Sequence, residues 1–150
     1  MDRQAQSELA TKNAERLLIA NGFGDILPLN VITYTDEEIN EYYNENNQNW
    51  VGQYATCSID SEDGLTVFLA IDKHESHRDM LDTILHEVGH GVWETIDNNG
   101  QQEWLETAKD DPHGPHESFA DHTMYVLQGL THLAFHADLF NKLTRLNEAH

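Results

Sequence analysis

The chain has 150 residues, a length that fits one domain with its own hydrophobic core, so we expect residues 1–150 to form a single domain. Eight basic and 27 acidic residues leave a formal net charge of −19, which argues against direct nucleic-acid binding because such binding needs Lys and Arg to neutralise phosphates. The same charge disfavours anionic membrane surfaces, and no apolar run is long enough to span a bilayer.

The cysteine count, the N-terminal residues and the net charge indicate the cellular location and the oligomeric state. One cysteine, Cys57, excludes an internal disulfide, and the polar N-terminal residues do not match a signal peptide, so we expect a cytoplasmic protein. Repulsion between like charges favours a monomer.

The first half of the chain predicts a helix, a strand and a second helix. Good helix formers occupy positions 4–20, and an Asn-Gly pair follows as a stop signal. Many β-branched residues in Leu29–Tyr34 predict a strand. Thr35 and Glu38 form a capping box that opens a polar helix to about Tyr43, and the Asn-rich stretch after it predicts a solvated loop.

A β-hairpin is the clearest strand signal. Gln53–Ile59 and Leu65–Ile71 are separated by an acidic turn that ends in glycine. The longest helical pattern comes next, with Ser76 as its N-cap and Asp97–Gly100 as its expected end. Its apolar residues recur with a period of 3.6: Met80, Leu81, Ile84, Leu85, Val88, Val92, Trp93 and Ile96.

The last third of the chain predicts two more helices. A short helical turn is expected at Glu103-Trp104-Leu105, and Pro112 and Pro115 keep the following stretch irregular. A long helix then begins at His116, and Thr131 caps a final one.

His86-Glu87-Val88-Gly89-His90 carries the chemistry of this sequence. Positions four apart share one face of a helix, so His86 and His90 can bind a single ion. Glu87 lies beside them, placed to take a proton from water at that ion. Two imidazoles with a neighbouring carboxylate indicate a zinc hydrolase site.

A hydrolytic zinc ion needs a third protein ligand and one open position. We expect Glu117, near the start of the next long helix, to be that ligand. Asp121 lies four residues later on the same face, where it could accept the spare N–H of a ligand histidine and fix its tautomer.

An H-E-x-x-H helix followed by Glu-x-x-x-Asp on a later helix resembles the gluzincin arrangement of zinc peptidases, and in particular the compact ImmA/IrrE-like metallopeptidases. The likeness covers roughly residues 31–130 and includes the hairpin before the site helix; the chain lacks the DNA-binding helix-turn-helix of some relatives. The resemblance implies an α+β fold of the minimal zincin type, with a small mixed or antiparallel sheet packed on the site helix and further helices around it.

The resemblance also implies a zinc-dependent endopeptidase that acts on a protein or peptide substrate. One Zn²⁺ per chain would be held by His86, His90 and Glu117, with Glu87 as general base. The strand Leu65–Ile71 would be the sheet edge along which an extended peptide pairs.

Three alternatives stay open. The group that stabilises the oxyanion is one of six candidates: His113, His116, His122, Tyr125, His132 and His136. His132 and His136 are also spaced to share a second ion. The high acidity could instead belong to a non-catalytic binding or regulatory protein, such as a nucleic-acid mimic or inhibitor, built on a zincin scaffold.

Overall fold

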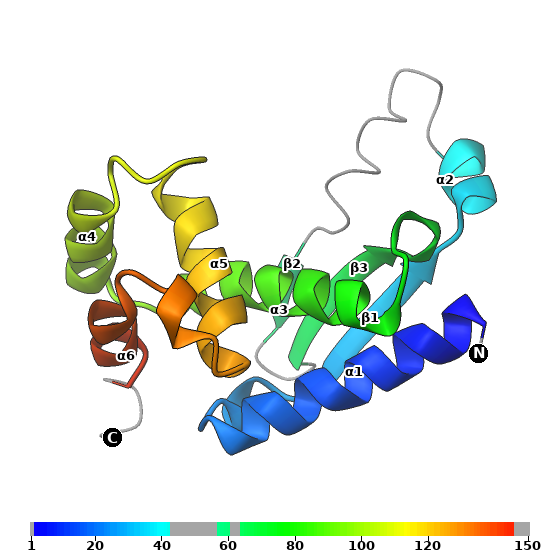
Figure 1. Ribbon diagram of the computed structural model, residues 1–150, viewed down its shortest axis with the longest axis horizontal. Coiled ribbons are helices and arrows are strands. Elements are labelled where there is room, and N and C mark those ends of the chain that lie inside the picture. Colours follow the sequence, from blue (N-terminus) through cyan, green and yellow to red (C-terminus); the bar gives the residue numbers. More distant parts are fainter. Residues whose placement is uncertain (1, 43–56, 61–63, 146–150) are drawn as a thin grey trace.

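The computed structural model describes residues 2–42, 57–60 and 64–145, which form an α+β fold of six helices and a small sheet (Figure 1). Strand β3 (Gly64–Ala70) lies in the middle of the sheet, parallel to β1 (Leu29–Tyr34) and antiparallel to β2 (Cys57–Asp60). The α+β class is therefore confirmed. The expected Asn-rich loop, the first residues of the hairpin and its turn lie outside the described residues.

The expectation that Leu65–Ile71 forms a sheet edge is wrong. Strand β3 has a neighbour on each side, and its alternate side chains Leu65, Val67 and Leu69 are almost wholly buried. Among the described strands, β1 and β2 each pair on one side only. An extended ligand at a sheet edge would therefore have to pair with β1 or β2.

Helix α1 (Arg3–Ala20) packs against α3 and β1, and its small residues Ala10 and Ala14 are fully buried there. Gly22 follows the helix with a φ of 85°, a left-handed conformation that glycine adopts without strain, as the stop signal predicts.

Helix α2 (Asp36–Tyr42) begins at the predicted capping box. The Thr35 hydroxyl accepts the Glu38 N–H at 3.1 Å, and the Glu38 carboxylate accepts the Thr35 N–H at 3.1 Å.

Helix α3 (His77–Glu94) lies at the centre of the fold and packs against α1, α5, β2 and β3 (Figure 1). The hydroxyl of Ser76 accepts the Asp79 N–H and caps the helix as predicted. The apolar stripe is buried, with Met80, Ile84, Leu85 and Val88 fully enclosed. Because the stripe fixes the rotation of the helix, it also fixes which residues come to the edge of the buried face.

The stretch Asp97–Gly100 does not serve only as an end signal. Helix α3 has already ended at Glu94, and α4 (Asn98–Thr107) starts here because the Asp97 carboxylate accepts the Gly100 N–H at 2.7 Å. The expected short turn around Trp104 is part of this three-turn helix, which the fully buried Trp104 side chain attaches to the core.

Helix α5 (Pro115–Leu127) begins close to its expected start, with Pro115 in the first turn. The last helix, α6 (Ala137–Arg145), begins later than predicted because Thr131 opens only a short 3₁₀ turn, η4 (Thr131–Leu133). None of the helices within the described residues is long and apolar enough to cross a membrane.

Candidate metal centre

Helix α3 presents His86 and His90 at the edge of its buried face. Both side chains are partly exposed, at 20% and 30%, and their ring centroids lie 5.0 Å apart at an interplanar angle of 82°. The spacing of four residues thus brings both imidazoles to one place, as the sequence predicts.

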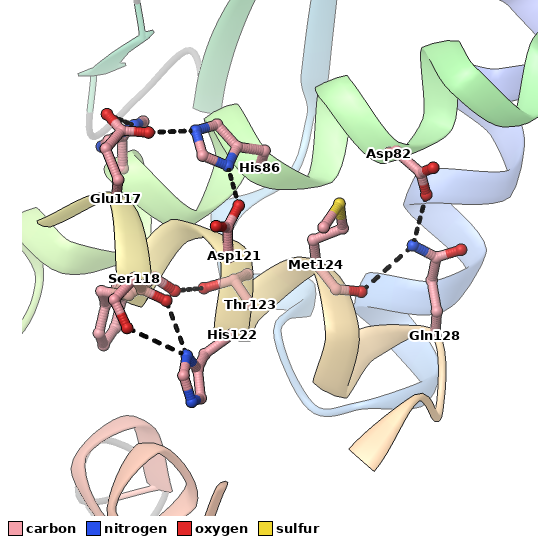
Figure 2. A network of polar contacts seen from close by, with 11 residues as sticks. Asp82, His86, Glu117, Ser118, Asp121, His122, Thr123, Met124 and Gln128 are labelled. Carbon is pink, nitrogen blue, oxygen red and sulfur yellow. Dashed lines mark hydrogen bonds and ion pairs between the residues drawn. The ribbon is translucent and has the colours of Figure 1, made fainter. Parts of the chain in front are cut away.

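Helix α5 brings Glu117 to the same place (Figure 2). One carboxylate oxygen of Glu117 lies 2.8 Å from Nε2 of His86, and the other lies 3.3 Å from Nε2 of His90. The ligand atoms of the three residues all lie within 4.8 Å of one another. Within the described part of the chain, this is the one group of three or more such side chains that could hold a metal ion.

Close contact between the two helices makes this convergence possible. A Cβ added at Gly89 of α3 would lie 2.6 Å from the Cα of Ala120 and 2.8 Å from the hydroxyl of Thr123, both on α5. Only glycine allows the two backbones to come this near. Gly89 is the residue just before His90, so the contact lies directly beside the site.

Asp121 contacts His86 from the side opposite Glu117. The Nδ1–H of His86 donates to the Asp121 carboxylate at 2.8 Å, which leaves Nε2 directed at Glu117 (Figure 2). Burial lowers the pKa of His86, but the hydrogen bond and charge of Asp121, together with Glu87 and Glu117, raise it above its usual value overall. The structure therefore brings Asp121 to the position that the sequence predicts for it.

Burial shifts the pKa values of both Glu87 and His90. The Glu87 side chain is buried, and burial together with the charge of Glu117 raises its pKa to about 7, against the opposing effect of His86. Burial lowers the pKa of His90, and the neighbouring histidines His86 and His116 lower it further, while Glu117 opposes them. The site thus holds a carboxyl group that loses its proton near neutral pH, beside the imidazole of His90, whose lowered pKa favours the neutral form.

The donor set fits zinc. Imidazole nitrogens and a carboxylate oxygen are ordinary zinc ligands, and a tetrahedral ion about 2.1 Å from each donor holds neighbouring donors roughly 3.4 Å apart. One Glu117 oxygen lies 3.3 Å from Nε2 of His90, close to that value, whereas the other lies 2.8 Å from Nε2 of His86, a hydrogen-bond distance that would lengthen slightly around an ion. A cation bound at this place would replace the protons that the imidazoles carry on Nε2 in its absence.

The six candidates for the oxyanion group fall in different places. His116 directly precedes Glu117 on α5 and is exposed, and its ring lies 5.1 Å from that of Trp93 on α3. Tyr125 lies two turns along α5 from Glu117; burial and the charges of Asp121 and Asp82 raise its pKa. His113 and His132 are exposed, outside the group of metal donors.

His122 and His136 belong to a separate polar cluster. The His122 ring donates to the Ser118 carbonyl and accepts from the His136 backbone N–H, while the His136 ring contacts Asp111. The proposed second ion at His132 and His136 gains no third donor among the described residues. Sequence reasoning missed Asp111 and Ser118, because nothing in a pattern indicates partners that lie seven to 25 positions apart.

Comparison with protein families, with curated proteins and with solved structures finds no match to this chain. The arrangement of the site itself therefore carries the functional argument.

Proposed function

We propose that this protein is a zinc-dependent metallopeptidase of gluzincin type, with a minimal zincin fold like that of the ImmA/IrrE-like family. One observation carries the proposal: two histidines of α3 and a glutamate of α5 converge within 4.8 Å, and Glu87 of the same α3 turn is available as a base. A chance H-E-x-x-H sequence would not explain a third donor delivered from a helix 27 residues further along the chain, with Asp121 already bonded to the first histidine.

His86, His90 and Glu117 would hold the zinc ion. When bound, zinc lowers the pKa of a water molecule and polarises the scissile carbonyl. Asp121 keeps His86 in the tautomer whose Nε2 lone pair is free to bind a metal. Glu87 takes the proton of the attacking water and passes it to the leaving amine.

The substrate is a protein or peptide, bound in extended form. Strand β3 is paired on both sides, so among the described strands the edge next to the site helix is β2, which packs against α3, whereas β1 packs against α1. Main-chain hydrogen bonds to β2 would orient the scissile bond without requiring a particular side chain.

His116 is the best of the six candidates for the oxyanion. It directly precedes Glu117 on α5, and its ring meets that of Trp93 on α3 edge to face. From there it donates a hydrogen bond to the carbonyl oxygen as that oxygen gains negative charge. His116→Gln should lower kcat by about 10²-fold with little change in KM; an unchanged kcat would exclude this role.

A second function rests on the net charge of −19. An acidic protein could bind basic partners, or imitate nucleic acid, without cutting anything. The two functions differ at Glu87, since binding by charge does not need this buried carboxyl group.

Metal analysis beside cleavage assays tests the proposal. Wild-type protein should hold about one zinc ion per chain, and His86→Ala and Glu117→Ala should lose it, while His132→Ala serves as a matched histidine control. Glu87→Gln should keep zinc and cut a proteome-derived peptide library about 10²- to 10⁴-fold more slowly. Wild-type protein that takes up no zinc would disprove the enzyme; zinc binding with equal cleavage by Glu87→Gln would disprove the mechanism.

A further inference from the structure

Helix α5 carries a second polar face behind the metal donors. Figure 2 shows Glu117 and Asp121 on one side of the helix and Ser118 and His122 on the other. Each residue of the rear pair directly follows one of the front pair. Contacts that fix Ser118 and His122 on this rear face therefore also fix the positions of Glu117 and Asp121 on the front face.

The rear face is part of a closed ring of hydrogen bonds. The Ser118 hydroxyl donates to the Asp111 carboxylate at 2.6 Å, and the His122 Nδ1–H donates to the Ser118 carbonyl at 2.7 Å. The His136 backbone N–H donates to Nε2 of His122 at 3.0 Å, and the His136 ring returns to Asp111 at 3.1 Å. The ring joins the α4–α5 loop, the first two turns of α5 and the residue just before α6.

Aromatic side chains pack around this ring of hydrogen bonds. The rings of His122 and His136 stack with centroids 5.4 Å apart, and the fully buried Trp104 meets both with its edge or face. Phe140 of α6 packs on Phe119 of α5 at 5.1 Å. The segment 131–145 is therefore attached to α5 at Phe119 and His122, directly after the turn that carries Glu117, and to that turn through Asp111.

The N-terminus of α5 depends on such outside contacts. The preceding residue, Gly114, supplies no side-chain cap, and it and His113 have positive φ angles of 93° and 69°. The first turn is held instead by the bond from Ser118 to Asp111 and by the Trp104 indole N–H, which donates to the Pro115 carbonyl at 2.9 Å. Glu117 lies in that turn.

We infer that the ring of Asp111, Ser118, His122 and His136 couples docking of the C-terminal segment 131–145 to metal binding at Glu117. His136 and Ser118 are positioning residues in this scheme. The docked segment holds the first turn of α5 where Glu117 meets His86 and His90, and a bound ion in turn stabilises the docked segment, because coupling between two sites is reciprocal. The inference rests on the proposed metal site.

Zinc affinity of matched variants tests the inference. His136→Ala opens the ring and should weaken zinc binding by roughly tenfold, as measured by competition with a chromophoric chelator. His136→Gln can still donate to Asp111 and should restore most of the affinity, and His132→Ala, an exposed neighbour, should have none of this effect. The Co²⁺-loaded His136→Ala protein should show altered d–d absorption, because its carboxylate ligand is no longer held in place.

A second pair of variants separates positioning from general loss of stability. Ser118→Ala and Thr144→Val each delete a buried hydroxyl, but on the described part of the chain the Thr144 hydroxyl bonds only within α6, to the carbonyls of Phe140 and Asn141. Only Ser118→Ala should weaken zinc binding. This pair decides the question if His136→Ala fails to fold.

Hydrogen exchange supplies the reciprocal measurement. Zinc should slow amide exchange in residues 137–145 of the wild type, and it should not do so in His136→Ala. Wild-type zinc affinity in folded His136→Ala and in Ser118→Ala would overturn the coupling and leave the peptidase proposal intact. Wild-type protein that binds no zinc would overturn both.

Discussion

His86 lies between two carboxylates that do different work. Glu117 approaches Nε2, the nitrogen that would bind a metal, and Asp121 accepts the proton on Nδ1. Without an ion the two acids stabilise a protonated imidazole, which is why the pKa of His86 lies above its usual value even though burial opposes the charge. A cation would take the place of the proton on Nε2 and leave the bond to Asp121 unchanged.

Two substitutions at Asp121 should separate the contributions of its hydrogen bond and of its charge to zinc affinity. Asp121→Ala removes the acceptor for the His86 N–H and should weaken zinc binding by about 10- to 100-fold. Asp121→Asn keeps an acceptor oxygen and should therefore weaken zinc binding less than Asp121→Ala does. Competition with a chelator measures both affinities, with Asp82→Asn as a control, because Asp82 bonds to Gln128 and to no histidine on the described chain. Equal losses in Asp121→Asn and Asp121→Ala would show that charge alone matters.

At the level of elements, the site depends on how closely α3 and α5 approach. The glycine between Val88 and His90 removes a side chain at the crossing point, where Ala120 and Thr123 of α5 fill the space. Neither helix carries a complete ligand set, so the distance between them decides whether a metal can be bound.

Gly89→Ala should therefore damage both stability and metal binding. The new Cβ would meet the backbone of Ala120 at 2.6 Å, a contact that only a shift of one helix can relieve. Overpacking of this kind costs about 1–3 kcal/mol, and a clash with backbone belongs at the upper end, where it exceeds the gain of roughly 1 kcal/mol from alanine in a helix. Urea unfolding and zinc titration would measure the two effects.

Gly24→Ala is the control, since no heavy atom lies within 4 Å of a Cβ at that position. A Gly89→Ala protein as stable as the wild type, with unchanged zinc affinity, would contradict the role given to this helix contact.

At the scale of the whole molecule, one hydrophobic cluster reaches from Ala10 in α1 to Leu143 in α6. Two buried histidines, His74 and His122, lie in different parts of the fold. The His74 ring bonds the Ala70 carbonyl and the Thr83 hydroxyl, each at 2.8 Å, while His122 belongs to the ring behind the metal donors. Burial lowers the pKa of both.

Acid should therefore weaken the fold through His74. Its folded-state pKa lies below the unfolded value of 6.5, so the unfolded chain takes up the proton first as the pH falls. The stabilising contribution is complete above pH 6.5 and is lost as the pH drops through the folded-state pKa. The net charge of −19 acts in the opposite sense, because protonation relieves repulsion.

Comparison with His74→Gln isolates the histidine from this background of charge. Urea titrations with a chelator present give the free energy of unfolding of the metal-free proteins. At pH 7 this free energy should be larger for the wild type than for His74→Gln. The difference should shrink at pH 5, because only the wild type has the buried imidazole to protonate. A difference of the same size at both pH values would contradict the prediction.

Local sequence determined much of this protein. Helical spacing brought His86 and His90 together, a capping box opened α2, and Ser76 began the site helix, because each of these depends on neighbours within four residues. The pairing of Glu117 with Asp121 was also readable, since both lie on one face of a single helix. Asp97 was misjudged because the same residues can end one helix or cap the next.

Tertiary structure alone decided the rest. The central place of β3 depends on its two neighbours, and the start of α6 depends on how the segment after η4 docks on α5. The separation of His116 from the other oxyanion candidates, and the ring through Asp111, Ser118, His122 and His136, join residues from different elements. Such contacts follow from how the buried faces of the helices meet, which no local spacing encodes.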